Sequence, residues 1–516
     1  MPYQISPEID FSSVGLVTDL PSNAIPTGGW SNSLNVRPRN GSVQGVNSFA
    51  NDILLHNSDN VIANGEAKAI CQYTPAGSND LVLAYIVKGT DNFGHVVLYD
   101  TAGSGSWDDI TNSTADQKFT FDDNFPPQIF VFNELLIVNP AVDAPPQFTS
   151  ATASANSLAE LPNWLSDSSG SVIICRILRP FNQRLIAMSI KEEHGAGTSD
   201  DKFQPIDFLF SSHITTISSL AAASWTASTT NTAGDAFLLG TPGKILDGGQ
   251  LGEFFIAYKT DSVVRVRETG DANVIAIESI FEDDGIYSTR CFANIGNSQH
   301  LVVGNYGIYI HDGQSERKDI AKDLFKDTMY ALVKPAEKNR TFVFVQTRDR
   351  EVWLCLPSNS NNTTGCDIAF CYDYSTGKIH KRTLPGVTDI FETELDGNLK
   401  IFATKSGTRL QTLSNTALEA NGFFERQDDN LGDNGKVKHI KRIEVNSVGT
   451  VKLALTGTQN LSDSKSYTDV TFNPVTDHKV DMRTSGRYMN LRVTMNGTVN
   501  PELTKLQFDV KIMGVR

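Results

Sequence analysis

The sequence has few of the features that mark membrane, secreted or nucleic-acid-binding proteins. Its longest apolar run is Leu81–Val87, far below the roughly 20 residues that a membrane-spanning helix needs. The N-terminus lacks the basic start and apolar core of a signal peptide. With 59 acidic and 44 basic side chains and a formal net charge of −15, the chain also lacks the excess of Lys and Arg that neutralises phosphates. We therefore expect no stable membrane insertion and no nucleic-acid-binding surface. The acidity favours either solubility or a surface along which DNA slides without specific binding.

Cysteine is scarce as well. The six cysteines stand at positions 71, 175, 291, 355, 366 and 371 of 516 residues. Five lie in or beside apolar segments, which is typical of small buried thiols in a reducing compartment rather than of a disulfide framework. Cys366 and Cys371 have no second pair at a zinc-ligand spacing. The sequence thus predicts no metal and no cofactor.

Catalytic motifs are missing too. The nine histidines are dispersed, and the chain has no His-Glu-x-x-His pair, no Gly-x-Ser-x-Gly elbow and no phosphate-binding glycine loop. A glycosidase pair of carboxylates leaves no local motif, because its two members can be far apart in the chain. Glu282, Asp283 and Asp284 form an acidic run just before a strand, which favours a solvated turn over a catalytic or metal-binding cluster. We expect no enzymatic activity.

What the sequence does contain is a recurring strand-and-turn pattern. The apolar runs 301–303 and 308–310 flank Gly304-Asn305-Tyr306-Gly307, which has the composition of a hairpin turn. Further paired apolar runs lie at 81–100, 129–139, 254–267 and 341–356. Serial hairpins of this kind are typical of a β-propeller or a large β-sandwich. We predict an all-β protein with a β-propeller of consecutive hairpins over residues 61–425.

Three of the predicted strands end on an aspartate that precedes a glycine-containing turn. These aspartates are Asp100, Asp312 and Asp373. A carboxylate in this position can accept hydrogen bonds from the backbone of the turn, while glycine supplies the left-handed conformation. We predict that all three are structural turn residues.

Apolar residues at helical spacing occur only over Lys318–Lys334, and Asp319 is the candidate N-terminal cap of that helix.

The two ends of the chain differ from the hairpin region. Residues 1–60 contain five prolines, which forbid a continuous helix or central strand, so they predict an extended arm that packs on the propeller or on a partner. The candidate partner-docking residues in the arm are Trp30, Asn35, Arg37 and Arg39. Residues 426–516 predict a separate antiparallel β-sandwich, since apolar and polar residues alternate over 489–495 and 506–512. The polar stretch 427–435 is interpreted as the linker before it.

Several segments resemble, in the same order along the chain, tail proteins of short-tailed bacteriophages. They are Leu20–Pro26, Trp30–Arg37, Asn40–Val43, Asn182–Ala187, Phe208–Ser211, Gly307–Tyr309, Gly486–Arg492 and Met513–Arg516. The ordered set is similar to the podovirus tail nozzle, also called tail tubular protein B, and to the related packaged-DNA-stabilising tail hub proteins. Members of that family carry a β-propeller and assemble as hexamers below the portal and adaptor rings, around the channel through which the genome leaves.

The resemblance implies a structural, non-enzymatic protein of the virion tail that is assembled in the host cytoplasm. The partners it implies are further copies in a homo-hexamer, the tail adaptor protein, tail fibres or spikes, and genomic DNA that passes without specific binding. The alternative is a propeller-type glycan-binding protein or a glycan hydrolase or depolymerase. Its sugar platforms would be the tryptophans Trp107, Trp164, Trp225 and Trp353.

Overall fold

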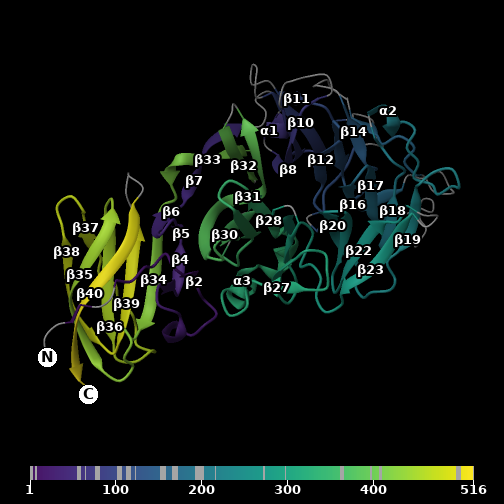
Figure 1. The fold of residues 1–516 in the computed structure, drawn as a ribbon. Coiled ribbons are helices and arrows are strands. Elements are labelled where there is room, and N and C mark those ends of the chain that lie inside the picture. Colours follow the sequence, from purple (N-terminus) through teal and green to yellow (C-terminus); the bar gives the residue numbers. More distant parts are fainter. Residues whose placement is uncertain are drawn as a thin grey trace.

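A computed structural model describes most of the chain. The described residues are 4–5, 8–54, 60–63, 65–75, 82–100, 107–111, 118–122, 124–150, 158–165, 173–191, 203–215, 217–270, 274–296, 298–360, 365–395, 398–405, 409–495 and 501–514. Figure 1 shows a ring of short strands joined to a smaller two-layered β region that holds both termini.

Within these residues, five separate sheets of four antiparallel strands follow one another along the chain. The first two are β8 (Glu66–Tyr73), β9 (Val82–Lys88), β10 (Gly94–Asp100) and β11 (Trp107–Asp109), then β12 (Gln128–Phe132), β13 (Leu135–Asn139), β14 (Gln147–Thr149) and β15 (Ala159–Glu160). The third is β16 (Ile174–Phe181), β17 (Arg184–Lys191), β18 (Phe203–Phe210) and β19 (Gly234–Phe237). The last two are β20 (Ile245–Leu251), β21 (Phe254–Lys259), β22 (Val263–Glu268) and β23 (Ile275–Phe281), then β24 (Phe292–Asn294), β25 (His300–Val303), β26 (Ile308–His311) and β27 (Arg317–Asp319).

The next sheet contains two further blades that share one strand. Its main path is β28 (Phe342–Gln346), β29 (Glu351–Leu356), β30 (Cys366–Asp373), β31 (Ile379–Leu395), β32 (Asn398–Lys405), β33 (Arg409–Leu418) and β7 (Asn47–Leu54). The first half of β31 pairs with β30, and its second half pairs with β32. The described strands therefore form a seven-bladed propeller, with β7 from the N-terminal region as the outer strand of the last blade.

The ring closes where the last blade packs on the first. Phe402 of β32 and Leu410 of β33 share an apolar cluster with Leu83, Tyr85 and Val97 of the first blade. Radial closure of this kind leaves no long unpaired sheet edge, which is the reason that serial hairpins fold into propellers. The short connections also suit the fold: Asn133 and Glu134, between β12 and β13, have φ values of 48° and 63°, as a two-residue hairpin turn of type I′ requires.

The smaller region consists of two antiparallel sheets. One has the order β38 (Lys479–Gly486), β35 (Val437–Val448), β40 (Glu502–Gly514), β6 (Ser42–Gly45) and β5 (Val36–Arg39), with β1 (Gln4–Ile5) also paired to β40. The other has the order β37 (Val470–Phe472), β36 (Val451–Thr458), β39 (Tyr488–Met495), β34 (Gly422–Asp429) and β4 (Asn32–Leu34). Apolar side chains from both sheets belong to one buried cluster, including Ile440, Leu453, Val493 and Phe508.

The expected domain boundaries need correction. The N-terminal arm is not a separate unit, because β1, β4, β5 and β6 complete the two C-terminal sheets while β7 completes the propeller. Pro38 is accommodated because β5 is an edge strand, which tolerates a missing N–H. The boundary expected at 425/426 falls inside β34. Residues 427–435 contain the end of that strand and the turn to β35, so they do not link two domains.

Helices are few and short in the described part of the chain. They are η1 (Ser22–Ala24), α1 (Asn60–Ala63), α2 (Ile217–Leu220), α3 (Lys326–Leu332) and η3 (Pro335–Arg340). No described helix has the length and apolar character needed to cross a membrane. The helix expected over Lys318–Lys334 is shorter, because β27 and a turn occupy its first part. Asp319 bonds the backbone N–H groups of that turn, at Ala321 and Lys322.

The carboxylate that accepts hydrogen bonds at the N-terminus of α3 belongs to the N-terminal segment. The carboxylate of Asp19 accepts the N–H groups of Asp327 at 2.7 Å and Thr328 at 3.1 Å. Before it, β2 (Gly15–Leu16) lies parallel to β3 (Gly29–Trp30), and Gly15 also pairs with Ile379. The N-terminal segment thus runs between the propeller and the two C-terminal sheets and contacts both.

Candidate functional site

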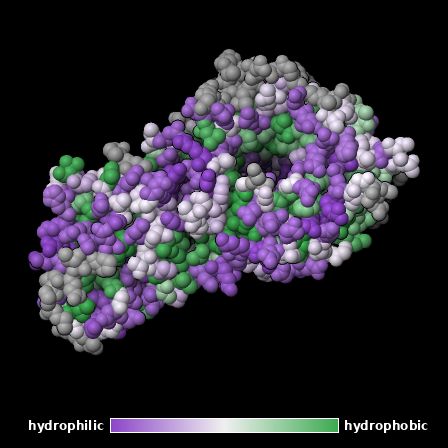
Figure 2. Space-filling view, in the orientation of Figure 1, coloured by the Kyte–Doolittle hydropathy of each residue, from purple (hydrophilic) through white to green (hydrophobic). Residues whose placement is uncertain are grey.

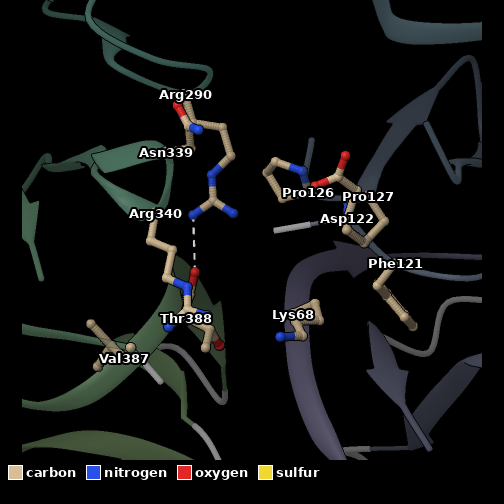
Figure 3. Close-up of a pocket in the computed structure, with 11 residues that line it drawn as sticks. Lys68, Phe121, Asp122, Pro126, Pro127, Arg290, Asn339, Arg340, Val387 and Thr388 are labelled. Carbon is tan, nitrogen blue, oxygen red and sulfur yellow. Dashed lines mark hydrogen bonds between the residues drawn. The ribbon is translucent and has the colours of Figure 1, made fainter. Parts of the chain in front are cut away.

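A small cavity lies where several inner strands of the propeller begin. We call this place the propeller mouth. Its lining comes from blades far apart in the sequence: Lys68, Phe121, Asp122, Pro126, Pro127, Arg290, Asn339, Arg340, Gly365, Val387 and Thr388. Figure 3 shows Arg290, Arg340 and Thr388 on one wall, opposite Asp122 and Lys68 on the other. In the space-filling view the propeller half is hollowed on the face shown, which is mostly hydrophilic.

Buried ionic groups connect the blades around the mouth. The guanidinium of Arg179 on β16 donates two hydrogen bonds to Asp247 on β20, at 2.9 and 3.0 Å. The same carboxylate accepts the backbone N–H of Arg290 at 2.8 Å. The Arg290 side chain then reaches β31, where it donates to Asp389 at 3.2 Å and to the carbonyl of Thr388 at 3.0 Å. Asp389 finally accepts the N–H of Ile70 on β8 at 3.1 Å.

This series, which we call the ionic chain, satisfies charges that would be costly to bury alone. Asp247 is fully buried and Arg179 largely so. Burial raises the pKa of Asp389, and the neighbouring Arg290 opposes that rise. Arg290 has a φ of 64°, a left-handed conformation that is uncommon outside glycine. The ionic chain links the first, third, fourth and last blades to the segment that begins the fifth, so it fixes their relative positions.

The size of the mouth limits what it can bind. The space open to the centre of a water molecule is about 50 Å³, and about 10–15 Å³ of such space holds one water molecule. The cavity therefore has room for a few water molecules or a small ion. The described lining residues offer mainly hydrogen-bond donors, and the Thr388 hydroxyl is already bonded to the carbonyl of Ala67 at 2.6 Å.

The candidate docking residues of the arm are engaged within the chain. Trp30 is fully buried, stacks on Phe424 with ring centroids 5.1 Å apart, and donates its indole N–H to the carbonyl of Phe11. Arg37 and Arg39 both pair with Asp349, each at 2.8 Å. Trp30 therefore packs on β34 of the C-terminal sheets, whereas Arg37 and Arg39 contact the propeller at Asp349, in the turn between β28 and β29. All three side chains have partners within the chain, and docking of another protein by this segment stays a prediction.

Asn35 has the same internal role. Its side-chain oxygen accepts the N–H of Thr383 at 2.8 Å, and its amide donates to the carbonyl of Ala420 at 3.0 Å. Its φ of 57° is left-handed, which asparagine tolerates better than most residues. Asn35 therefore joins β31 of the propeller to the segment that leads into β34.

Two of the three predicted turn aspartates are fully described. Asp312 accepts the N–H of Gln314 at 3.0 Å. Asp373 accepts the N–H groups of Ser375 and Thr376 at 2.8 and 3.1 Å, and both hydroxyls as well. Asp100 is the last residue of β10, but its side chain and the turn that follows lie outside the described residues.

The acidic run divides into two environments. Asp283 is exposed and pairs with Arg317 at 2.6 Å. Asp284 is buried, so the expectation of a solvated turn is wrong for this residue. Its carboxylate accepts the N–H groups of Gly285, Asn305 and Tyr306, and burial raises its pKa against the effect of these bonds. The absence of a Cβ at Gly304 makes room, since an added Cβ would lie 2.4 Å from the Asp284 oxygen.

The tryptophans do not form an exposed sugar-binding surface in the described structure. Trp164, Trp225 and Trp353 are buried, and the first two pack edge to face with centroids 4.6 Å apart. The side chain of Trp107 lies outside the described residues.

The ionic chain could not be predicted from the sequence, because a single Arg or Asp in a strand gives no indication of the distant residue that it will contact.

Comparisons with known proteins add a structural likeness. No family model and no curated protein sequence matches this chain. Among solved structures, a crystal structure of the WD40 β-propeller domain of Doa1 aligns with 72% of this chain and 97% of its own, at 9% identity and a TM-score of 0.38. The propeller assignment made above comes from the strand pairing of this chain itself.

Proposed function

We propose that this chain is a structural component of a short-tailed bacteriophage tail. In this proposal six copies form a nozzle or hub below the portal and adaptor, which forms part of the DNA-ejection channel and helps to retain the packaged genome. The chain would act by assembly and by its surface charge, without catalysis.

The observation that carries the proposal is the meeting of the phage-like segments in space. The carbonyl groups of Ser22 and Ile25 accept hydrogen bonds from Arg426 of β34. On the same strand, Glu425 pairs with Asn32 on one side and Arg426 pairs with Leu491 on the other. The strand β34 is therefore surrounded by three of the segments that resemble the tail proteins, namely 20–26, 30–37 and 486–492. The segments that carry the resemblance therefore belong to one structural unit, which supports the proposal.

The way in which the N-terminal segment joins the two parts of the chain also supports a mechanical role. It supplies a strand to the last propeller blade and strands to both C-terminal sheets. Trp30, Leu16 and Phe424 lie in the same buried cluster as Tyr372 of the propeller and Leu491 of the C-terminal sheets. A subunit that resists the pressure of packaged DNA needs such continuity, because a flexible linker would let its two parts separate.

In this proposal the DNA passes between subunits and not through the propeller. Six copies would carry a formal charge of −90, from −15 each, and a ring of that sign repels the phosphates of the duplex. The repulsion extends over about 8 Å at physiological salt, which discourages contact with the wall while still permitting threading.

The test is to determine the assembly state of the purified chain, alone and mixed with the adaptor-bearing tail. Light scattering after size exclusion and negative-stain imaging should show six-fold rings or tubes, at least in the presence of the tail. Duplex DNA should not bind at low salt. A strictly monomeric chain that stays off the tail particle would contradict the proposal. Hydrolysis or saturable binding of capsular or lipopolysaccharide glycans would favour the alternative class instead.

A further inference from the structure

Three buried side chains with metal-binding atoms meet on one face of the sheet formed by β29, β30 and β31. They are Glu351, Cys371 and His380, and one ligand atom from each lies within 4.8 Å of the other two. The strand register produces the cluster: Cys371 stands opposite His380 on one side and opposite Trp353 on the other. Glu351 lies two residues before Trp353, so it shares the same face.

The set has the chemistry of a zinc site. Thiolate, imidazole and carboxylate bind Zn²⁺ at about 2.0–2.3 Å, and its tetrahedral ligands lie about 3.4–3.8 Å apart. The three ligand atoms lie within 4.8 Å of one another. They would therefore have to approach by about 1 Å to bind one ion, and side-chain rotation allows such a movement. Mg²⁺ and Ca²⁺ prefer sites made of oxygen ligands alone, so the thiol and the imidazole favour zinc or a similar transition metal.

The imidazole of His380 is free to coordinate, and the carboxylate of Glu351 is held in place by a neighbour. His380 is 2% exposed, and neither of its ring nitrogens has a hydrogen-bond partner among the described residues. Burial lowers the pKa of His380, which keeps the imidazole neutral and able to coordinate. The indole N–H of Trp353 donates to Oε2 of Glu351 at 3.0 Å. Outer contacts of this kind orient ligating carboxylates in metal sites.

An ion can reach the cluster from one side. Glu351 and His380 line a polar cavity of about 580 Å³ that extends to Arg39 and Arg348. Three protein ligands and a cavity leave a fourth position for water, as in zinc sites that remain open.

Two arginines lie beside the cluster, and each has another partner. Arg37 lies 3.6 Å from Oε1 of Glu351, but its guanidinium is paired with Asp349 at 2.8 Å. Arg382 is stacked over the Trp353 ring, with its guanidinium carbon 4.2 Å from the ring centroid. The thiolate of Cys371 and the carboxylate of Glu351 would together supply two negative charges, which balance the two positive charges of the ion.

We propose that Glu351, Cys371 and His380 bind one zinc ion at the junction of the last two propeller blades. Binding forms a Zn–S bond and breaks the S–H bond of Cys371, and the proton leaves to water in the cavity. The ion holds β29, β30 and β31 together, beside the place where Arg37 and Arg39 of the N-terminal segment dock. This inference does not depend on the tail role proposed above.

The test uses the full chain, first stripped with a chelator and then exposed to Zn²⁺ or Co²⁺. We expect one tightly held zinc per chain after dialysis, measured by elemental analysis. The Co²⁺ form should show a thiolate-to-cobalt charge-transfer band, which reports coordination by cysteine directly. Thermal unfolding should move to higher temperature on addition of Zn²⁺, since binding to the folded state alone stabilises it.

Variants locate the site. Cys371→Ala should abolish the charge-transfer band, and Glu351→Gln or His380→Gln should weaken zinc binding at least about tenfold. The matched control is Cys355→Ala, which removes another fully buried cysteine of the same sheet that is outside the cluster. Circular dichroism identifies the variants that remain folded.

Three results would overturn the proposal. The first is a parent chain that keeps no zinc after dialysis, and the second is a Co²⁺ form without a thiolate band. The third is a folded Glu351→Gln or His380→Gln variant with parental zinc affinity. The first two are read on the parent chain, so they decide the question even if a variant fails to fold.

Discussion

Tyr258 and His300 meet in the core with the phenolic oxygen 2.6 Å from Nδ1 of the imidazole. The same oxygen lies 2.8 Å from Nε2 of His311, whose Nδ1 accepts the N–H of Gly313. His311 therefore carries its proton on Nε2 and donates it to Tyr258, so the tyrosine donates to His300. His300 then donates from Nε2 to the carbonyl of Gln250 at 3.1 Å. Every group in this series is satisfied only if both histidines are neutral.

Acid should therefore destabilise the fold through these two histidines. Burial lowers the pKa of His300 to about 3 and that of His311 to about 4, below about 6.5 in the unfolded chain. Between pH 6.5 and about 4 the unfolded state binds more protons, so stability is intact above pH 6.5 and falls as the pH drops. At pH 4.5 the loss is on the order of 2–3 kcal/mol for each histidine.

This pH dependence can be measured by urea unfolding at pH 7.5 and pH 4.5. His300→Gln and His311→Gln should lose less stability on acidification than the parent chain, although both start from a lower value. His478→Gln, at an exposed position, is the control and should keep the parental difference. Identical acid sensitivity in all four proteins would contradict the assignment.

Asp247→Asn should destabilise the propeller strongly. The substitution removes the charge that pairs with buried Arg179 and weakens the acceptor for the Arg290 N–H. Breaking one partner of a buried ion pair costs about 3–5 kcal/mol. Asp283→Asn is the comparison, because it breaks an exposed pair with Arg317 that is worth about 0–1 kcal/mol. Chemical denaturation measures both, and equal losses would show that the ionic chain adds little stability.

Asn35→Ala should cost more than Asn40→Ala. Both residues lie in the N-terminal segment with left-handed φ values, 57° and 51°, so both substitutions carry a similar backbone penalty. Only Asn35 is buried and bonded to Thr383 and Ala420. Leaving those partners unsatisfied adds about 1–3 kcal/mol. A thermal-shift comparison of the two variants tests this, and an equal decrease would argue against a clamping role for Asn35.

A C-terminal fragment that begins at Gly435 should not fold. The alternation in its sequence favours an independent sandwich, but the fragment lacks β34, which pairs with β39, and the N-terminal strands β1 and β6, which pair with β40. Its sheets would expose unpaired edges and part of their core. Circular dichroism and amide dispersion by NMR should therefore show a disordered chain. A cooperative thermal transition would mean that the N-terminal strands are dispensable.

The sequence by itself determined the local part of this structure. The turns after Asp312 and Asp373 follow from interactions within a few positions: each carboxylate accepts a backbone N–H of its own turn, and Gly313 and Gly377 have positive φ values. The alternation in 489–495 likewise produced a strand with the expected buried face. A propeller of serial hairpins follows from such local signals, because radial closure protects their edges.

Only the tertiary structure determined the contacts between residues that are far apart in the sequence. Asp19 caps a helix more than 300 residues away, and Trp30 stacks on Phe424. The prolines of the N-terminal segment did not reveal that its strands would complete the two C-terminal sheets and the last propeller blade. The same is true of Glu351, Cys371 and His380, whose spacing matches no ligand motif. Such contacts depend on strand register and blade order, which are set by the summed packing of the whole ring and not by any local window.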